Sequence, residues 1–285
     1  MNTFKKMAIV TGLSCISITA SAHHLTPDQQ AKLSSILGCL SQSNDTVHIH
    51  GCNLQITNGL GETSSNNGTG NLIIGYNNGA SAPSAPTAST SGSHNLVIGH
   101  GHTYTRSGSF IAGTNNTVHS PSSFVTGSSG LAEGRNASRS TIAGGLGNKN
   151  LAFQSGILGG NSNTISDQFS HAMVILGGQH NDLDGQYSTI AGGVRNKVVK
   201  ALQANILGGE DNTATVQQTV IAGGRFNTAA REAATILGGQ NNIAKGFRST
   251  IAGGAERQTT TDHEFRAGVF NSQDPYRADA TNSND

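Results

Sequence analysis

The histidines are the side chains whose type and spacing come closest to a chemical site. Eleven are present, and two pairs, His48 with His50 and His100 with His102, are separated by one residue. Residues two apart share one face of a strand, where two imidazoles can hold a metal ion. No cysteine or carboxylate accompanies either pair at a fixed spacing. We therefore interpret both pairs as polar strand faces and expect neither a metal site nor another cofactor.

Sequence motifs for catalysis are missing. The chain has no Ser/His/Asp elbow, no Walker loop and no paired carboxylates, and its Gly-Gly pairs do not open helices. Charged residues make up 12% of the 285 residues, aromatic residues 5%, and the net charge is +1. A chain without a basic excess lacks the electrostatic footprint of nucleic-acid binding. The composition also argues against a conventional enzyme core, so we expect a protein that is not an enzyme.

The N-terminus predicts a secretory signal peptide over residues 1–22. Two lysines precede an apolar run from Met7 to Ile18, and Ala20-Ser21-Ala22 offers small residues for cleavage before His23. The run is much shorter than the roughly 20 residues of a membrane-spanning helix, so we expect no integral membrane segment after cleavage. Lipoprotein cleavage before Cys15 is the less favoured alternative. The sequence thus predicts an exported chain that is extracellular, at the cell surface or periplasmic.

Two cysteines, Cys39 and Cys52, remain after this cleavage. In an oxidising compartment, two cysteines 13 residues apart favour a disulfide over a metal site or a nucleophile. Before them, Thr26-Pro27-Asp28-Gln29 predicts a helix start, and Leu33, Ile36, Leu37 and Leu40 would lie on one helical face. We expect this helix to cap the repeats described below, the disulfide to tie the cap to them, and the first strands to lie at residues 47–50 and 54–57.

An internal repeat is the strongest signal in the chain. The pattern Ile, Ala or Leu, Gly, Gly occurs eight times, with spacings of 15, 18, 15, 16, 15, 15 and 15 residues. Its isoleucines are Ile142, Ile157, Ile175, Ile190, Ile206, Ile221, Ile236 and Ile251. Six residues after the isoleucine stands an asparagine, at Asn148, Asn163, Asn181, Asn196, Asn212, Asn227 and Asn242. Four weaker copies lie upstream, and a degenerate copy follows at residue 266.

This period predicts an all-β parallel solenoid. Fifteen residues are too few for two packed helices, and a Gly-Gly pair would cost a helix about 2 kcal/mol. Two short strands with two turns fit instead, the isoleucine pointing inward and the glycines making a tight turn. Thirteen coils spaced about 4.8 Å apart would form a rod of about 60 Å. The asparagine row is either a ladder of side-chain amides between coils or a set of turn formers.

The residue after the isoleucine predicts how the chain assembles. A coil with one isoleucine and one further small apolar residue is too thin to be self-sufficient, so several rods should pack together. An apolar row occupies the place after the isoleucine and would otherwise meet water; its large members are Leu158, Leu176, Leu207 and Leu237. We expect this row to form a subunit interface. The alternative is a wider, two-sided core within one chain.

The repeats resemble the head repeat of trimeric autotransporter adhesins, the bacterial hemagglutinin repeat family. Thr141-Ile142-Ala143-Gly144-Gly145 with Asn148, and Asn95-Leu96-Val97-Ile98-Gly99, match its Ser-Val-Ala-Ile-Gly pattern, and the similarity covers about residues 70–270. The resemblance implies a left-handed parallel β-roll, a homotrimer, and display at a bacterial surface for adhesion. After the last repeat the sequence has neither heptads nor alternating amphipathic strands, so we expect no stalk or anchor of that family's kind.

Together these observations predict four segments and one leading function. The segments are a signal peptide at 1–22, a helical cap with first strands at 23–60, solenoid repeats at 61–270 with a flexible loop at 79–93, and a polar tail at 271–285. The leading function is a secreted, adhesin-head-like trimeric rod that attaches to a surface, matrix or host ligand. An ice-binding solenoid, or a solenoid enzyme acting on polysaccharide or acyl groups, are the alternatives. The first lacks an unbroken Thr array, and the second lacks a carboxylate cluster.

Overall fold

The structure is a computed structural model that describes residues 26–78, 90–133, 139–166 and 171–268. The predicted signal peptide, most of the 79–93 loop and the polar tail therefore lie outside the described residues. The chain divides into two compact units, one up to Gln55 and one from Ile56 onward. We describe each unit by itself.

The first unit is a helix followed by a hairpin. Helix α1 (Pro27–Gly38) begins with the predicted capping box, in which Thr26 and Gln29 each accept the other's backbone N–H. Strands β1 (Leu40–Ser43) and β2 (Thr46–Ile49) pair antiparallel. The predicted first solenoid strand at 47–50 was therefore wrong, because this segment pairs within the hairpin. The second, at 54–57, is irregular backbone.

The predicted disulfide is confirmed, but the prediction that it ties a cap to the repeats was wrong. Cys39 and Cys52 are bonded, and both lie in the first unit. The bridge joins the end of α1 to the segment just after β2, so it braces the unit internally and does not tie a cap to the repeats. Helix α1 buries none of its residues. The expectation that α1 caps the solenoid stays a prediction.

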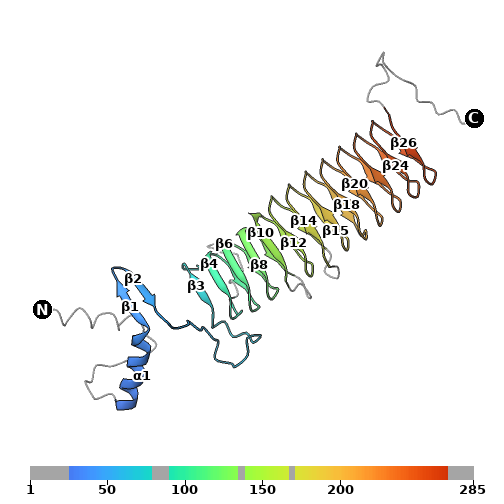
Figure 1. Cartoon of the computed structure of the whole chain (residues 1–285). Helices are drawn as coiled ribbons and strands as arrows, with labels where there is room; N and C mark the ends of the chain where they lie inside the picture. The colour runs from blue at the N-terminus through green and yellow to red at the C-terminus, as the bar shows by residue number, and fades with distance from the viewer. Residues whose placement is uncertain (1–25, 79–89, 134–138, 167–170, 269–285) are drawn as a thin grey trace, which may run out of the picture. The chain divides into compact units, whose positions relative to one another are not determined.

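The second unit is a β-solenoid built from two parallel sheets whose strands stack coil upon coil (Figure 1). The 13-stranded sheet contains β3 (Leu72–Ile74), β4 (Leu96–His100), β6 (Phe110–Thr114), β8 (Phe124–Ser128), β10 (Thr141–Leu146), β12 (Gly156–Ile157), β14 (Val174–Ile175), β16 (Thr189–Ile190), β18 (Asn205–Ile206), β20 (Val220–Ile221), β22 (Thr235–Ile236), β24 (Thr250–Ile251) and β26 (Phe265–Arg266). The 11-stranded sheet contains β5 (Thr103–Tyr104), β7 (Thr117–Val118), β9 (Leu131–Ala132), β11 (Lys149–Asn150), β13 (Thr164–Ile165), β15 (Asp182–Asp184), β17 (Lys197–Val199), β19 (Thr213–Ala214), β21 (Thr228–Ala229), β23 (Ile243–Ala244) and β25 (Gln258–Thr259). The predicted fold class is thereby confirmed.

The repeat isoleucines form the core of the coils, as predicted. All eight are fully buried, and the first seven pair in register with the isoleucine of the next coil, as Ile206 does with Ile221. The second apolar column, eight residues after each isoleucine, is buried on the other sheet, for example at Leu183 and Ala229. Asn150 interrupts that column, but its side chain donates to the Ser155 carbonyl at 2.8 Å and accepts from the Ala152 N–H at 3.2 Å. The polar exception is therefore satisfied inside the core.

The two glycines of each repeat have different roles, which the sequence did not distinguish. Gly209, a second glycine, has φ of +88°, and an added Cβ would lie 2.1 Å from the carbonyl oxygen of Gly224 in the next coil. Gly208, a first glycine, has open space around an added Cβ and no left-handed φ. In six of the eight repeats only the second glycine is required by the turn, whereas the first glycines Gly144 and Gly253 also have a positive φ. Beyond this turn a third line of parallel bridges, such as Glu210 with Arg225, supplements the predicted two strands.

Residues 56–70 cover part of the N-terminal end of the solenoid unit. The Gly68 N–H donates to the Ser91 carbonyl at 2.9 Å, and the Asn67 N–H donates to the Ser93 hydroxyl at 3.0 Å. The Asn58 N–H donates to His94 at 3.2 Å. This irregular polar segment thus bonds to hydrogen-bonding groups that the end of a solenoid would otherwise leave without partners.

Candidate functional site

The asparagines six residues after each isoleucine form a continuous hydrogen-bonded column. Each is at most 1% exposed. Asn212 is representative: its Oδ1 accepts the backbone N–H of Asn227 at 3.0 Å, and its Nδ2 donates to the carbonyls of Gly208 at 3.1 Å and Gly224 at 3.0 Å. The side chain therefore closes its own turn and also bonds the next coil. The asparagines are therefore both a ladder between coils and turn formers. Most of their side-chain amides bond backbone groups and not other side-chain amides.

The column starts earlier than the sequence indicated, and a histidine belongs to it. His102 donates its N–H to Asn77 Oδ1 at 2.8 Å and accepts the Asn116 N–H at its Nδ1 at 3.3 Å. His102 is fully buried, whereas His100 ends β4 and is exposed. The prediction that the two share a strand face was wrong, because the chain turns between β4 and β5.

The other histidine pair also lacks the surroundings of a metal site. His48 and His50 stack with ring centroids 5.5 Å apart, and His50 Nε2 lies 2.9 Å from the Ser41 hydroxyl. Within the described ranges, no group of three His, Cys, Asp or Glu side chains could hold a metal ion. The same part of the chain contains no helix with the length and apolar character needed to cross a bilayer.

The predicted interface leucines lie on the outside of the 13-stranded sheet. Leu158, Leu176, Leu207 and Leu237 are 51%, 47%, 55% and 52% exposed. The alternative of a two-sided core within one chain is therefore excluded. Because strand side chains alternate, the residue before the isoleucine shares this outer face, and Asn205 therefore lies on the same face as Leu207.

Two outward columns of the 13-stranded sheet contain no charged side chain, and we call these two columns the uncharged face. Its first column is Leu72, Leu96, Phe110, Phe124, Thr141, Gly156, Val174, Thr189, Asn205, Val220, Thr235, Thr250 and Phe265. Its second column is Ile74, Ile98, Ala112, Thr126, Ala143, Leu158, Leu176, Ala191, Leu207, Ala222, Leu237, Ala252 and Ala267. Phe110 and Phe124 stack on it with ring centroids 5.1 Å apart. The residues before the isoleucines, which the sequence showed as a broken Thr array, make up much of the first column.

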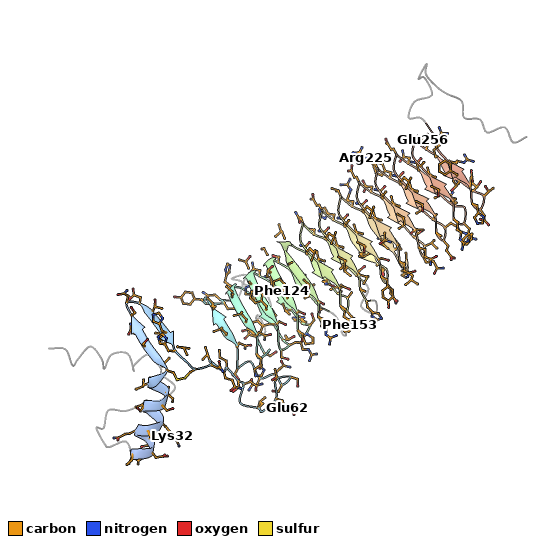
Figure 2. The ribbon with its side chains drawn as sticks, in the orientation of Figure 1. Lys32, Glu62, Phe124, Phe153, Arg225 and Glu256 are labelled. Atoms are coloured by element: carbon orange, nitrogen blue, oxygen red, sulfur yellow. A yellow bond between two sulfur atoms is a disulfide. The ribbon has the colours of Figure 1, made fainter. Side chains whose placement is uncertain are left out.

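The charges of the solenoid lie on other surfaces. The 11-stranded sheet carries Lys149, Asp182 and Lys197, and Lys197 Nζ lies 3.3 Å from Asp182. At the corner after the glycines, Arg195 pairs with Glu210 and Asp211 of the next coil, and Arg225 pairs with Glu210 at 2.7 Å. These cations lower the pKa of Glu210, mainly through the hydrogen bond from Arg225, and of Asp211. Figure 2 shows Arg225 and Glu256 along one edge of the stack and Phe153 along the other.

Comparison with known families and proteins adds no identification. No family model matches the chain, and no curated protein matches it. The candidate functional site is the uncharged face, which includes the predicted interface leucines.

Proposed function

We propose that the chain is an exported, non-enzymatic rod that assembles as a homotrimer through the uncharged face and serves attachment at a bacterial surface. The observation that carries this proposal is the contrast between the two sheets. Two outward columns of one sheet contain no charge, while the other sheet and the corner carry ion pairs. Extended apolar surfaces of this kind mark protein–protein contacts.

The exposed leucines give the contact an energy scale. Each of the four is about half exposed, so burying the remainder would contribute about 1 kcal/mol per leucine. The alanines between them leave room for the large side chains of a neighbouring rod. Repetition from coil to coil then makes the total contact large, although each coil contributes little.

The first glycine of each repeat supports close approach by a partner at the same place. Six of these glycines, among them Gly177, Gly208 and Gly238, have open space around an added Cβ and no left-handed φ. The single chain therefore does not require glycine there, yet every strong repeat has it. Glycine without an internal reason is found where another backbone comes close. These glycines directly follow the leucine row.

The attachment role rests on the family resemblance together with the rod. The pattern around Ile142 and Val97 resembles adhesin head repeats, which implies a trimer displayed at a bacterial surface. The described residues offer a stacked β-solenoid, which is suited to holding a binding surface at a distance. The ligand class that we propose is a surface, matrix or host molecule.

Light scattering tests the assembly. The mature chain from His23 should have three times the chain mass. Leu207→Asp places carboxylates in an apolar contact, where burial without partners costs several kcal/mol each, and should abolish the trimer. Thr213→Asp, on the outward side of β19, is the matched control and should leave the mass unchanged. A monomeric wild-type chain, or a Leu207→Asp trimer with unchanged melting temperature, would overturn the proposed interface.

Attachment and export are tested separately. Labelled mature protein is applied to polystyrene, to collagen-coated and fibronectin-coated plates, and to cultured epithelial cells, with Leu207→Asp in parallel. Retention above an albumin control on at least one surface supports the attachment role, and no retention on any of them contradicts it. N-terminal sequencing of the exported protein should begin at His23.

A further inference from the structure

Two histidines at the N-terminal end of the solenoid unit accept backbone N–H groups through a ring nitrogen. In His102, Nε2 lies 3.0 Å from the Ile98 carbonyl oxygen, and Nδ1 lies 3.3 Å from the Asn116 backbone nitrogen. A carbonyl oxygen can only accept, so the ring proton sits on Nε2 and the bare Nδ1 accepts the Asn116 N–H. The neutral imidazole thus replaces the amide of the asparagine column.

His94 holds residues 56–70 against the first coils in the same way. Its Nδ1 lies 2.9 Å from the Thr63 carbonyl oxygen, and its Nε2 lies 3.2 Å from the Asn58 backbone nitrogen. Here the ring proton sits on Nδ1, and Nε2 is the acceptor. Asn58 is only 7% exposed, so its N–H has little access to water as a substitute. Both rings must therefore be neutral to make their bonds.

A second ring proton would turn each acceptor nitrogen into a donor that faces another donor. For His102 the closed structure resists this change: burial is the main cause that lowers its pKa, and His100 acts in the same direction. The Ile98 carbonyl opposes this shift, and Asn77 and Asn116 are neutral. His100 is the one titratable side chain that acts on His102 within the described ranges.

The other titratable groups described nearby do not accept a backbone N–H through a ring nitrogen as His94 and His102 do. Glu62, in the segment that His94 contacts, is exposed. One coil further on, His119 Nδ1 lies 3.5 Å from Glu133 Oε1 in a partly exposed pair. Toward the C-terminus the column consists of asparagines from Asn148 to Asn242, whose amides do not titrate.

We propose that the N-terminal end of the solenoid, within residues 56–78 and 90–118, is an acid-sensitive element that opens when a second ring proton removes the acceptor nitrogens of His94 and His102. The asparagine coils beyond residue 148 stay closed under the same conditions. Opening separates the polar segment from the residues that it bonds in the first coils, Ser91, Ser93 and His94.

The sign of the effect follows from linkage. The opened chain binds a proton at His102 with the ordinary pKa of 6.5, and the closed chain binds it less readily. Stability of the element is thus complete above this value and falls as the pH drops below it. Between pH 7.5 and 5.0 the opening constant should rise through His102, by at most about 30-fold, which is the limit for a ring that stays neutral in the closed chain.

Hydrogen–deuterium exchange of the mature chain, read by mass spectrometry and corrected for intrinsic rates, tests the proposal. Peptides within 56–77 and 95–118 should lose protection at pH 5.0 relative to pH 7.5. Peptides within 205–259 serve as the internal reference and should not change. Equal protection of the N-terminal peptides at both pH values would overturn the proposal, as would a uniform loss along the solenoid.

Substitution of the histidines assigns the effect. His102→Asn restores the residue type of the column, and His94→Asn keeps a residue that tolerates its positive φ of 55°. The double variant should keep its protection at pH 5.0. If it loses protection as the wild type does, the histidines are not the cause. Should the variants fail to fold, the chemical shifts of the His102 ring across the same pH range decide: uptake of a proton without change in amide protection contradicts the proposal.

Discussion

Removing one member of the asparagine column should be the most costly single polar change in the solenoid. In Asn212→Ala, the buried N–H of Asn227 loses its acceptor, and the Gly208 carbonyl loses the Nδ2 donor. An orphaned buried donor costs about 1–3 kcal/mol, and each further lost bond about 0.5–1.5 kcal/mol. The Gly224 carbonyl is affected less, because it still accepts the Glu210 N–H at 2.9 Å. We expect a loss of about 3 kcal/mol in the free energy of unfolding.

Urea denaturation followed by far-UV circular dichroism measures this loss, at two protein concentrations so that dissociation and unfolding are separated. Asn161→Ala is the matched control, since Asn161 is half-buried and its amide oxygen accepts only the neighbouring Ser162 hydroxyl. Asn212→Asp keeps the acceptor but places a carboxylate against two carbonyl oxygens, so it should be worse at pH 7 than at pH 4. If Asn212→Ala costs no more than Asn161→Ala, the column does not hold the coils together and our reasoning fails.

Three further predictions concern the turns, the last coil and the first unit. Gly209→Ala should prevent the coil from closing, because its Cβ would lie 2.1 Å from a carbonyl oxygen of the next coil; Gly208→Ala should leave the β signal in circular dichroism intact, and equal behaviour of the two would contradict this. Hydrogen bonds from Thr261 and Arg266 lower the pKa of Glu264 to about 2 from 4.5. Amide protection in the last coil should thus fall as the pH drops from about 4.5 to about 2, and Glu264→Gln should remove this dependence. Cys39→Ser should unfold the first unit, which buries no helix residue, without changing the melting of the solenoid; a shared transition would refute the independence of the two units.

Much of the fold could be predicted because the repeat is local. A period near 15 with one isoleucine and a Gly-Gly pair leaves few solutions, and the register of Ile206 on Ile221 follows once coils stack. The capping box at Thr26 and the bridge between Cys39 and Cys52 are equally local signals. Each depends on residues close together in the chain, so sequence spacing carries the information.

The misassigned elements depended on non-local pairing. Residues 46–49 have the pattern of a strand, but whether they pair with a solenoid coil or with β1 is a competition between distant partners. His100 and His102 have the spacing of a strand face, yet a turn between them buries one ring and exposes the other. Periodicity cannot detect such a turn when only two residues define it.

The sequence by itself determined the coil, its inward isoleucines and its asparagine row, since all three recur at fixed intervals. Only the tertiary structure decided which surface is uncharged, which glycine the turn requires, and that His102 belongs to the asparagine column. The physical reason is that these properties arise between coils. Whether a Cβ at Gly209 meets a carbonyl, or the space beside Gly208 is open, depends on the neighbouring coil about one strand spacing away. Such distances exist only after the chain has stacked on itself.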